Sequence, residues 1–395
     1  MYSRANLTLL FLLTLLQSCT LSQNPNSSHP ADRSFLTDAR YNQSERSFLI
    51  FKYRGYEENK VLKFTIKQLK PGKDFPDGIQ QLENIRNLTK EKSPDLVGIP
   101  LYQNVPGSVF ITRNLHCDEI EVSNIHWLEY LHYLKKDSSE SVALKMQPKA
   151  NLIKLVPQDF YAMDITGMIP EFPANEKKEW RFDTYLDHPG YRFFPVIGVS
   201  QEQAKAYCKW RSKFVTAQMH KQFPQTSSLN YNYRLPTEAE WEMIASTGFD
   251  KEKYPHALYP ENIINIKLKV NPGAAGYLAT KLPNPPPASQ IKADIKKFNK
   301  TNSLTNPEAA FNTHRNLPYF LNLSTPFYVY AYPPNDFGIY NMIGNVAEMV
   351  AEEGIAKGGS WLEPLTNSKI TDRKLYDKPA ADIGFRCVCE VEKLK

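Results

Sequence analysis

The chain has 395 residues, a formal net charge of +6 at pH 7, and 42% hydrophobic and 12% aromatic residues. The positive charge is spread along the sequence and is not interleaved with aromatic residues, so the composition excludes a nucleic-acid-binding groove from the expected functions. With 29 prolines and 17 glycines, the balance is that of a loop-rich globular protein and not of a disordered chain.

The N-terminal residues predict export and a lipid anchor. Arg4 supplies a positive charge, and the apolar run over residues 7–16 is too short to span a bilayer as a helix, which is typical of a signal peptide. The next residues, Leu-Gln-Ser-Cys ending at Cys19, resemble the lipobox of bacterial lipoproteins, in which the signal is cut before an acylated cysteine. We therefore expect residues 1–18 to be a signal peptide and Cys19 to be lipidated; the alternative is an ordinary secretory signal with a chance cysteine.

The residues after Cys19 indicate an aqueous compartment beside a membrane. No later apolar stretch approaches the ~20 residues of a membrane helix. The residues just after Cys19 carry no acidic cluster of the kind that resembles a surface-export signal of Bacteroidetes-like lipoproteins. The expected location is the periplasmic face of an outer membrane, to which the lipid attaches the chain.

Two N-terminal segments are expected before the main domain. Residues 19–46 carry many Asn, Ser, Pro and Asp residues and few large apolar ones, which is typical of a tether. Residues 47–97 contain strand-like runs at 48–51 and 61–66 and a polar helix over about 79–88. This second segment is either a small module or an arm packed on the main domain, and no role is assigned to it.

Stronger signals begin in residues 98–395, the expected main domain. The β-branched and aromatic run 109–112 follows turn residues and predicts a buried strand. After residues 118–124, a helix is expected with Trp127 and Leu131 on one face. A strand and a helix are thus predicted at the start of the domain.

Two capping boxes predict where later helices begin. Ser200 and Gln203 can satisfy each other's free backbone amides and open a helix that is expected to run to about residue 217. Thr237 and Glu240 repeat the device, and a glycine ends this second helix. These two helices are the best-marked elements of the sequence.

The C-terminal part combines irregular and strand-like segments. Residues 251–330 are expected to form long surface loops, because the proline run over 281–287 lacks the amide donors that helices and central strands need. Residues 357–361 and 383–389 are strand-like. The helices are therefore expected to combine with short strands and long loops.

Four segments of the main domain form an ordered set of motifs. They are Arg-Leu-Pro-Thr-Glu-Ala-Glu-Trp-Glu at 234–242, Asn-Asp-Phe-Gly-Ile-Tyr-Asn-Met-Ile-Gly-Asn-Val-Ala-Glu at 335–348, Gly-Gly-Ser-Trp at 358–361 and Gly-Phe-Arg-Cys at 384–387. Together they resemble the formylglycine-generating enzyme (sulfatase-modifying factor) family, whose early Asp-x-x-Glu-Val-Thr-Asn motif is similar to residues 118–124. The resemblance covers roughly residues 105–389 and implies the α+β fold of that family, which is C-type-lectin-like, loop-rich and low in regular secondary structure.

Members of that family oxidise a substrate cysteine with copper held by two cysteines that follow the Gly-Gly-Ser-aromatic segment. The resemblance places this position at residues 361–369, where Glu363 lies near the first ligand and no cysteine occurs between Cys208 and Cys387. Copper(I) prefers thiolates, whereas a carboxylate prefers harder ions. We therefore expect no copper, no formylglycine-generating activity and no catalytic residue.

A related branch of the fold carries iron-dependent sulfoxide synthases, which need a histidine cluster. No two of the eight histidines have His-x-x-x-His spacing. The histidines are His29, His116, His126, His132, His188, His220, His256 and His314. His126 and His132 could meet in space, but lone histidines on such segments are more often structural, so metal oxidase chemistry is the weaker alternative.

The resemblance also implies a structural calcium ion. The family's second calcium site uses a side-chain amide, two backbone carbonyls and a carboxylate. The corresponding residues are Asn341, Gly344, Val346 and Glu348. The alternative is a tight turn at Gly344 with a locally paired Glu348; the family's other calcium site is damaged, because its aspartate corresponds to Tyr330.

The family joins two cysteines that correspond here to Cys208 and Cys387, and an oxidising periplasm permits this disulfide. Cys117 and Cys389 remain in the main domain. A second bridge between them is a hypothesis, because Cys389 is expected on the same strand face as Cys387.

A closer resemblance bears on function. Residues 188–200, which run into 203–211, are similar to a segment of the gliding-motility and type IX secretion lipoproteins of Bacteroidetes. Those proteins share the lipobox and the fold, lack the catalytic cysteines, and are structural parts of an outer-membrane-associated assembly. The resemblance implies a non-catalytic scaffold whose loops, especially 251–330, bind other envelope proteins such as secretion or motility subunits.

The alternative function is an enzyme, or a carbohydrate- or peptide-binding protein, that uses the remodelled groove. Trp361, Glu363 and Arg373 are the candidate lining residues. Arg373 could equally be a buried structural arginine paired with an acid. A scaffold is expected to tolerate Glu363→Ala, whereas an enzyme is not.

Overall fold

The computed structural model describes the greater part of residues 78–394 and a few shorter pieces. The described residues are 62–65, 72–73, 76–99, 102–153, 161–164, 179–182, 184–188, 191–257, 267–270, 272–276, 279, 286–301, 326, 329–330, 334–363 and 365–394. The predicted signal peptide, Cys19, the tether and the strand-like run at 48–51 lie outside the described residues. Within the described part, no helix has the length and apolar character needed to cross a membrane.

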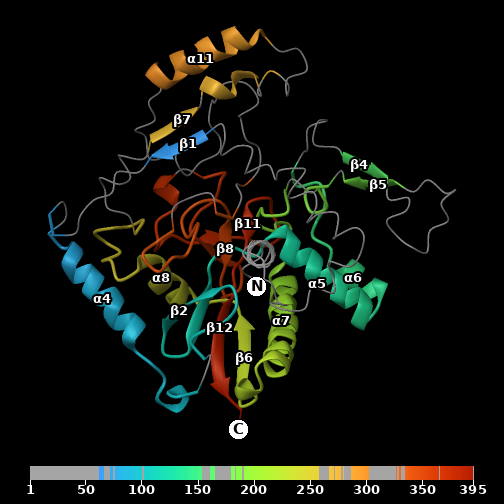
Figure 1. The fold of residues 1–395 in the computed structure, drawn as a ribbon, viewed down its shortest axis with the longest axis vertical. Coiled ribbons are helices and arrows are strands. Elements are labelled where there is room, and N and C mark those ends of the chain that lie inside the picture. The colour runs from blue at the N-terminus through green and yellow to red at the C-terminus, as the bar shows by residue number, and fades with distance from the viewer. Residues whose placement is uncertain are drawn as a thin grey trace, which may run out of the picture.

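A four-stranded antiparallel sheet forms the centre of the domain (Figure 1). Its strands, in spatial order, are β2 (Ser108–Thr112), β3 (Leu115–Asp118), β12 (Val388–Lys393) and β6 (Leu229–Arg234). Val388 of β12 lies opposite Cys117 on one side and opposite Arg234 on the other. A strand at 109–112 is confirmed, but only Ile111 is buried, because β2 is the edge strand of the sheet. The last strand of the chain, β12, lies between two much earlier ones.

Three helices begin at capping boxes. They are α5 (Asn124–Asp137), α7 (Gln201–Gln222) and α8 (Glu238–Ser246). The predicted caps of α7 and α8 are confirmed, since Ser200 accepts from the Gln203 amide and Thr237 from the Glu240 amide. α7 continues to Gln222, beyond the expected end, because its apolar face still packs on the sheet there, with Met219 2% exposed.

Side chains of α7 cover the outer edge of β6. The backbone amide of Tyr233 donates to Ser212 Oγ at 2.7 Å, and that of Tyr231 donates to Thr216 Oγ1 at 3.1 Å. Ser212 and Thr216 stand at i and i+4 positions and therefore share one face of the helix. Edge strands with free amides invite pairing with another chain, so α7 closes this edge to strand addition.

A second, smaller sheet carries the C-terminal motifs. Its strands, in spatial order, are β10 (Lys374–Leu375), β9 (Ile355–Lys357), β8 (Ala347–Met349) and β11 (Ile383–Gly384), with β11 parallel to β8. The predicted strand at 357–361 is wrong beyond Lys357. Gly358 and Gly359 have φ of +88° and +67°, a left-handed conformation that favours glycine, so the chain turns there.

Two hydrophobic clusters occupy the two faces of the central sheet. Cys117 and Val388 belong to the cluster that contains Trp241 and the residues of α8. Cys389 and Tyr233 belong to the cluster beneath α5 and α7, where aromatic rings stack closely. This alternation is the ordinary consequence of the two-residue period of a strand.

The N-terminal helix α4 (Gly78–Lys90) packs against the main domain as an arm (Figure 1). Ile85 is 8% exposed and belongs to the same cluster as Trp241. Asp77, which precedes α4, forms an ion pair with Lys253. The predicted helix is confirmed, and α4 packs on the main domain.

Residues 251–330, which were expected to form loops, also contain regular elements. They are β7 (Lys267–Val270), the 3-10 turn η6 (Pro272–Ala274) and α11 (Ala288–Thr301). β7 pairs antiparallel with β1 (Leu62–Thr65), which confirms a strand within 61–66. The loop prediction was wrong for α11, because the proline run ends at Pro287, whose carbonyl accepts the first helical hydrogen bonds from Gln290 and Ile291.

The remaining elements are short and connect or flank these layers. They are α6 (Glu140–Lys145), β4 (Tyr161–Asp164) paired antiparallel with β5 (Glu179–Phe182), and the 3-10 turns η2 (Pro94–Leu96), η5 (Pro224–Thr226) and η8 (Leu365–Asn367). Helices and mainly antiparallel sheets joined by long connections make this an α+β, loop-rich fold, as expected.

Candidate functional site

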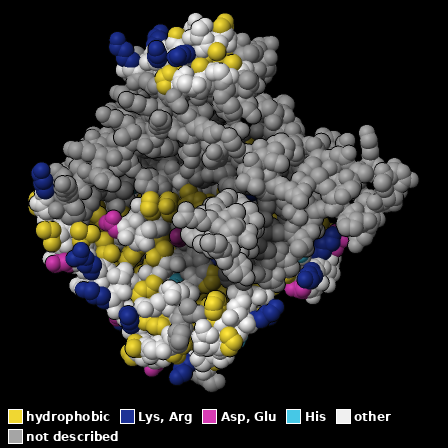
Figure 2. All heavy atoms as spheres, viewed as in Figure 1, with side chains coloured by type: hydrophobic (Ala, Val, Ile, Leu, Met, Phe, Trp, Pro, Cys, Tyr) yellow, Lys and Arg dark blue, Asp and Glu magenta, His cyan; other side chains and the backbone are white. Residues whose placement is uncertain are grey.

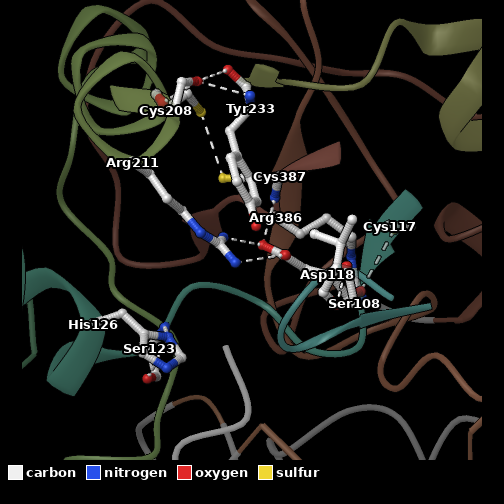
Figure 3. A network of polar contacts seen from close by, with 12 residues as sticks. Ser108, Cys117, Asp118, Ser123, His126, Cys208, Arg211, Tyr233, Arg386 and Cys387 are labelled. Atoms are coloured by element: carbon white, nitrogen blue, oxygen red, sulfur yellow. Dashed lines mark hydrogen bonds and ion pairs between the residues drawn. The ribbon is translucent and has the colours of Figure 1, made fainter. Parts of the chain in front are cut away.

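A buried ion pair joins α7 to the central sheet. Arg211 binds both carboxylate oxygens of Asp118, at 2.7 and 3.0 Å, and their side chains are 0% and 1% exposed (Figure 3). Asp118 Oδ2 also accepts from the backbone amide of Cys387 at 3.1 Å, and the Arg211 guanidinium lies 4.1 Å from the centre of the Tyr233 ring. The aspartate of the early motif therefore has a structural role.

A second buried pair involves the arginine of the Gly-Phe-Arg-Cys motif. Arg386 binds the two oxygens of Glu348 at 2.7 and 2.5 Å, and Trp241 Nε1 donates to the same carboxylate at 2.8 Å. Arg386 also donates to the carbonyls of Asp118 and Tyr340, at 3.0 and 2.8 Å. One guanidinium thus connects three motifs that are far apart in the sequence.

Glu121, the glutamate of the early motif, lies beside this second pair. It is fully buried and accepts from the side-chain amides of Asn341, at 3.1 Å, and Asn345, at 2.8 Å. Burial, opposed by Arg386 and reinforced by Glu348, raises the pKa of Glu121 to about 8. Glu121 is therefore largely protonated at neutral pH, which removes one negative charge from the buried network.

This proton predicts a pH dependence of stability. Glu121 in the folded chain keeps a proton that the unfolded chain, with the ordinary pKa of 4.5, has released, so the free energy of unfolding decreases as pH rises from 4.5 to about 8. The decrease is at most ~1.4 kcal/mol per pH unit. Urea unfolding across this interval should show a steeper decrease for the unmodified chain than for Glu121→Gln, which has no proton to lose; parallel curves would contradict the assignment.

The predicted calcium ligands do not fit a calcium ion in this geometry. Both oxygens of Glu348 accept from Arg386, and a cation there would have to displace a guanidinium that is 0% exposed. The Asn341 side-chain amide donates to Glu121 and to the Val329 carbonyl at 2.9 Å. Glu348 is paired, as the alternative expected, but its partner is the distant Arg386 and not a local residue.

This arrangement predicts stability that is independent of calcium. A ligand that binds only the folded state raises its stability in proportion to the logarithm of its concentration. Thermal unfolding in excess calcium and in chelator should give the same Tm, because Arg386 already neutralises the only carboxylate among the four positions. A Tm that rises with calcium and loses this response in Glu348→Gln would restore the calcium prediction.

The candidate groove residues bind partners of their own. Trp361 is 5% exposed and donates to the Ala381 carbonyl at 3.1 Å. Glu363 pairs with Lys374 at 2.9 Å, and Lys374 also pairs with Asp382 at 2.6 Å. Burial alone would lower the pKa of Lys374, but Asp382 and Glu363 outweigh it and hold this pKa above the ordinary value. The ammonium group therefore stays charged between two carboxylates.

Arg373 belongs to a different ion cluster. It binds both oxygens of Glu238 on α8, each at 2.7 Å, as the structural alternative expected. Its side chain is 58% exposed, so the expectation that such an arginine is buried was wrong. The Arg373 hydrogen bond, with Lys357, lowers the pKa of Glu238 to about 2. Glu363 and Arg373 therefore belong to two different ion clusters and do not form one site.

Lys357 was missed by the sequence reasoning. Its side chain is 0% exposed, and its ammonium lies 3.0 Å from Glu238 and 2.9 Å from Glu242. The available signal was the i, i+4 pair of glutamates in the first turns of a predicted helix, which places two carboxylates on one face. A lysine directly before the Gly-Gly turn is the partner they need.

The residues at the predicted copper position do not fit copper. Glu363 of this position accepts from the Lys374 ammonium at 2.9 Å. The same ammonium and the Ser360 hydroxyl, which adjoin the position, both donate to one oxygen of Asp382. These donors are oxygens and an ammonium group, whereas copper(I) is held by soft sulfur ligands. Among the described residues, no three or more His, Cys, Asp or Glu side chains form a group that could hold a metal ion.

The four described cysteines, Cys117, Cys208, Cys387 and Cys389, are all buried. The sulfurs of Cys208 and Cys387 lie 3.5 Å apart, so the two side chains point at each other, while the covalent bond stays a prediction (Figure 3). The hypothesis of a bridge between Cys117 and Cys389 is contradicted. Cys117 lies opposite Val388, the neighbour of Cys389, so the two cysteines point to opposite faces of the sheet.

Thiol labelling can test this pairing. We expect denaturing alkylation without reductant, followed by peptide mass analysis, to label Cys117 and Cys389 and to leave Cys208 and Cys387 unlabelled. The bond would close a loop of more than 100 residues, for which about 4 kcal/mol or more of stabilisation is expected. Labelling of all four cysteines in protein from an oxidising compartment would contradict the disulfide.

Comparison with known proteins relates residues 98–391 to the family described as the sulfatase-modifying factor enzyme 1-like domain. The chain is 27% identical over 210 residues to inactive C-alpha-formylglycine-generating enzyme 2 of Bos taurus, covering 49% of this chain and 50% of that protein. It is 26% identical over 242 residues to formylglycine-generating enzyme of Thermomonospora curvata, covering 52% and 57% respectively. The chain thus spans about half the length of the curated relatives it matches.

Among solved structures, PvdO from Pseudomonas aeruginosa is similar with 19% identity and a TM-score of 0.34, covering 76% of this chain and 89% of that one. Treponema denticola variable protein 1 is similar with 16% identity and a TM-score of 0.34, covering 70% and 84%. The curated relatives include proteins named as inactive and proteins named as formylglycine-generating enzymes, so the residues at the predicted copper position distinguish the two roles.

Proposed function

Because the chain belongs to the sulfatase-modifying factor family, we propose that it is a non-catalytic member that serves as a structural component of a bacterial envelope assembly. Relatives named inactive C-alpha-formylglycine-generating enzyme 2, from Bos taurus and Mus musculus, are compatible with a non-catalytic use of the fold. The active relatives make the residues at the copper position the decisive ones.

The ion cluster at that position carries the proposal. The Lys374 ammonium lies 2.9 Å from Glu363 and 2.6 Å from Asp382, so one lysine binds both carboxylates. The chain between Cys208 and Cys387 contains no cysteine that could take the place of a copper ligand. Because these side chains bind one another, they stabilise the segments that carry them and are less available to polarise a substrate.

The finer proposal concerns place and partners. We propose that Cys19 is acylated, that the protein lies on the periplasmic face of an outer membrane, and that it belongs to a gliding-motility or type IX secretion assembly. The lipobox-like residues and the segment 188–211 support this proposal by resemblance. One acyl chain alone binds a membrane only weakly, so a stable anchor takes a second chain or a basic patch beside the first.

Affinity purification tests this function. The chromosomally tagged protein is purified from gently solubilised outer membranes and compared, by quantitative mass spectrometry, with a Cys19→Ala control. We expect stoichiometric recovery of secretion or motility subunits with the unmodified protein and a loss of recovery with the control. Recovery of the protein alone, over several detergents, would contradict the scaffold.

The second candidate is a ligand-binding or enzymatic groove. Leu362 and Leu375 are 41% and 76% exposed, and they adjoin Glu363 and Lys374, which are in contact. Exposed apolar side chains beside a charged pair can bind a small amphipathic ligand. Screening of carbohydrates and peptides by thermal shift, with Leu375→Ser as control, tests this candidate.

A further inference from the structure

We propose that α11 is a contact site for an anionic phospholipid surface. α11 is amphipathic: Ile291 and Ile295 are 0% exposed, and the helix packs against β7 and η6. Its opposite face carries three exposed lysines at i, i+4 and i+8 positions, Lys292, Lys296 and Lys300. At 1.5 Å per residue, this row spans about 12 Å.

The charge on this face is not neutralised within the described part of the chain. Lys292, Lys296 and Lys300 form no ion pair with any described residue. The acid of the helix, Asp294, is half-buried and accepts from Gln290 Nε2 at 2.9 Å. A row of uncompensated lysines creates a positive surface that attracts an anionic partner.

The position of α11 favours a flat partner. Among the described elements, α11 lies at the outer edge of the molecule, at the top of Figure 1, and Figure 2 shows lysine and arginine side chains gathered there. A protruding face can meet a plane without interference from the rest of the domain. The lysine ammonium is a point charge on a flexible side chain, unlike the planar guanidinium of arginine. It therefore suits a surface of many equivalent headgroups better than a single ligand of fixed geometry.

α7 provides a matched comparison. Lys209, Lys213 and Lys221 are also exposed and lie along one face, but this helix packs against β6 in the body of the domain. Their row is about 18 Å long, so the charge is more dilute. Replacing either set of three lysines by glutamine lowers the net charge by the same amount and keeps good helix formers.

The inference extends the proposed membrane location, and the experiment separates the two. The purified full chain with Cys19→Ser, which cannot be acylated, is bound to phosphatidylglycerol-containing vesicles and to pure phosphatidylcholine vesicles. The ratio of the two affinities reports on charge and cancels the contribution of the apolar residues 7–16, which all variants share. Acylation of Cys19 is measured separately, by the mass of its peptide from the native membrane.

We expect the triple variant Lys292→Gln/Lys296→Gln/Lys300→Gln to reduce this ratio by roughly 100-fold at low salt, since each lysine near an anionic surface contributes roughly fivefold. The α7 variant Lys209→Gln/Lys213→Gln/Lys221→Gln should keep most of the preference, and added salt should weaken it. Equal losses in both variants, no loss in either, or selective photocrosslinking of position 296 to an acidic protein in cells would overturn the proposal. Circular dichroism and thermal unfolding verify that each variant is folded.

Discussion

Replacing Arg386 with methionine is expected to lower the free energy of unfolding by about 3–5 kcal/mol, because it leaves the carboxylate of Glu348 buried without its counter-charge. The side chains of both residues are at most 1% exposed, so water cannot replace the guanidinium. The same substitution removes the hydrogen bonds to the Asp118 and Tyr340 carbonyls. Urea unfolding of Arg386→Met against the unmodified chain measures the loss.

Two further variants separate charge from packing. Arg386→Met/Glu348→Gln removes both charges and should recover a large part of the loss, since a buried pair replaced by neutral groups is often close to neutral. Arg113→Met breaks a surface pair with Glu91, whose side chains are 67% and 44% exposed, and should cost less than about 1 kcal/mol. If Arg386→Met costs no more than Arg113→Met, the buried network does not hold the motifs together.

Gly359→Ala is the second large expected effect, with a loss of about 3 kcal/mol or more. A Cβ on Gly359 would collide with the Oγ and Cβ of Ser368 and lie 2.9 Å from its Cα. The φ of +67° adds strain of its own, which is about 1–2 kcal/mol for a non-glycine residue. Overpacking costs a further 1–3 kcal/mol or so. Thermal and urea unfolding of the variant measure the sum.

Gly338→Ala is the matched control for this variant. Gly338 has a φ of +87°, but a Cβ there would meet nothing within 4 Å. It should therefore show the conformational cost of about 1–2 kcal/mol without the collision. Equal losses at positions 338 and 359 would mean that the Gly-Gly-Ser turn is not as tightly packed as the structure indicates.

The helices could be predicted from the sequence because their starting signals are local. Ser200 with Gln203 and Thr237 with Glu240 satisfy free amides within one turn, so no tertiary information is needed. The start of α11 was not predicted, because the prolines before it were taken to exclude regular structure. However, Pro287 directly precedes the helix and accepts its first hydrogen bonds.

The candidate site could be predicted only in part. Its motifs were correctly located, but the partner of each charged residue depends on long-range contacts, such as Arg386 with Glu348 and Lys357 with two glutamates of α8. A calcium ion and a buried arginine both bind a carboxylate such as that of Glu348, and the sequence alone does not distinguish them. The opposite faces of Cys117 and Cys389 likewise follow from strand register, which the order of residues does not specify.

A chromosomal Glu363→Ala variant tests the central claim, a structural and non-catalytic role, most directly. Glu363 lies at the predicted copper position and contacts Lys374, which keeps Asp382 as its partner when the glutamate is removed. The account predicts unchanged protein level, unchanged recovery of envelope partners, and none of the phenotype of a deletion strain. The deletion phenotype in a strain with normal protein level and normal partner recovery would contradict it and would assign chemistry or ligand binding to this site.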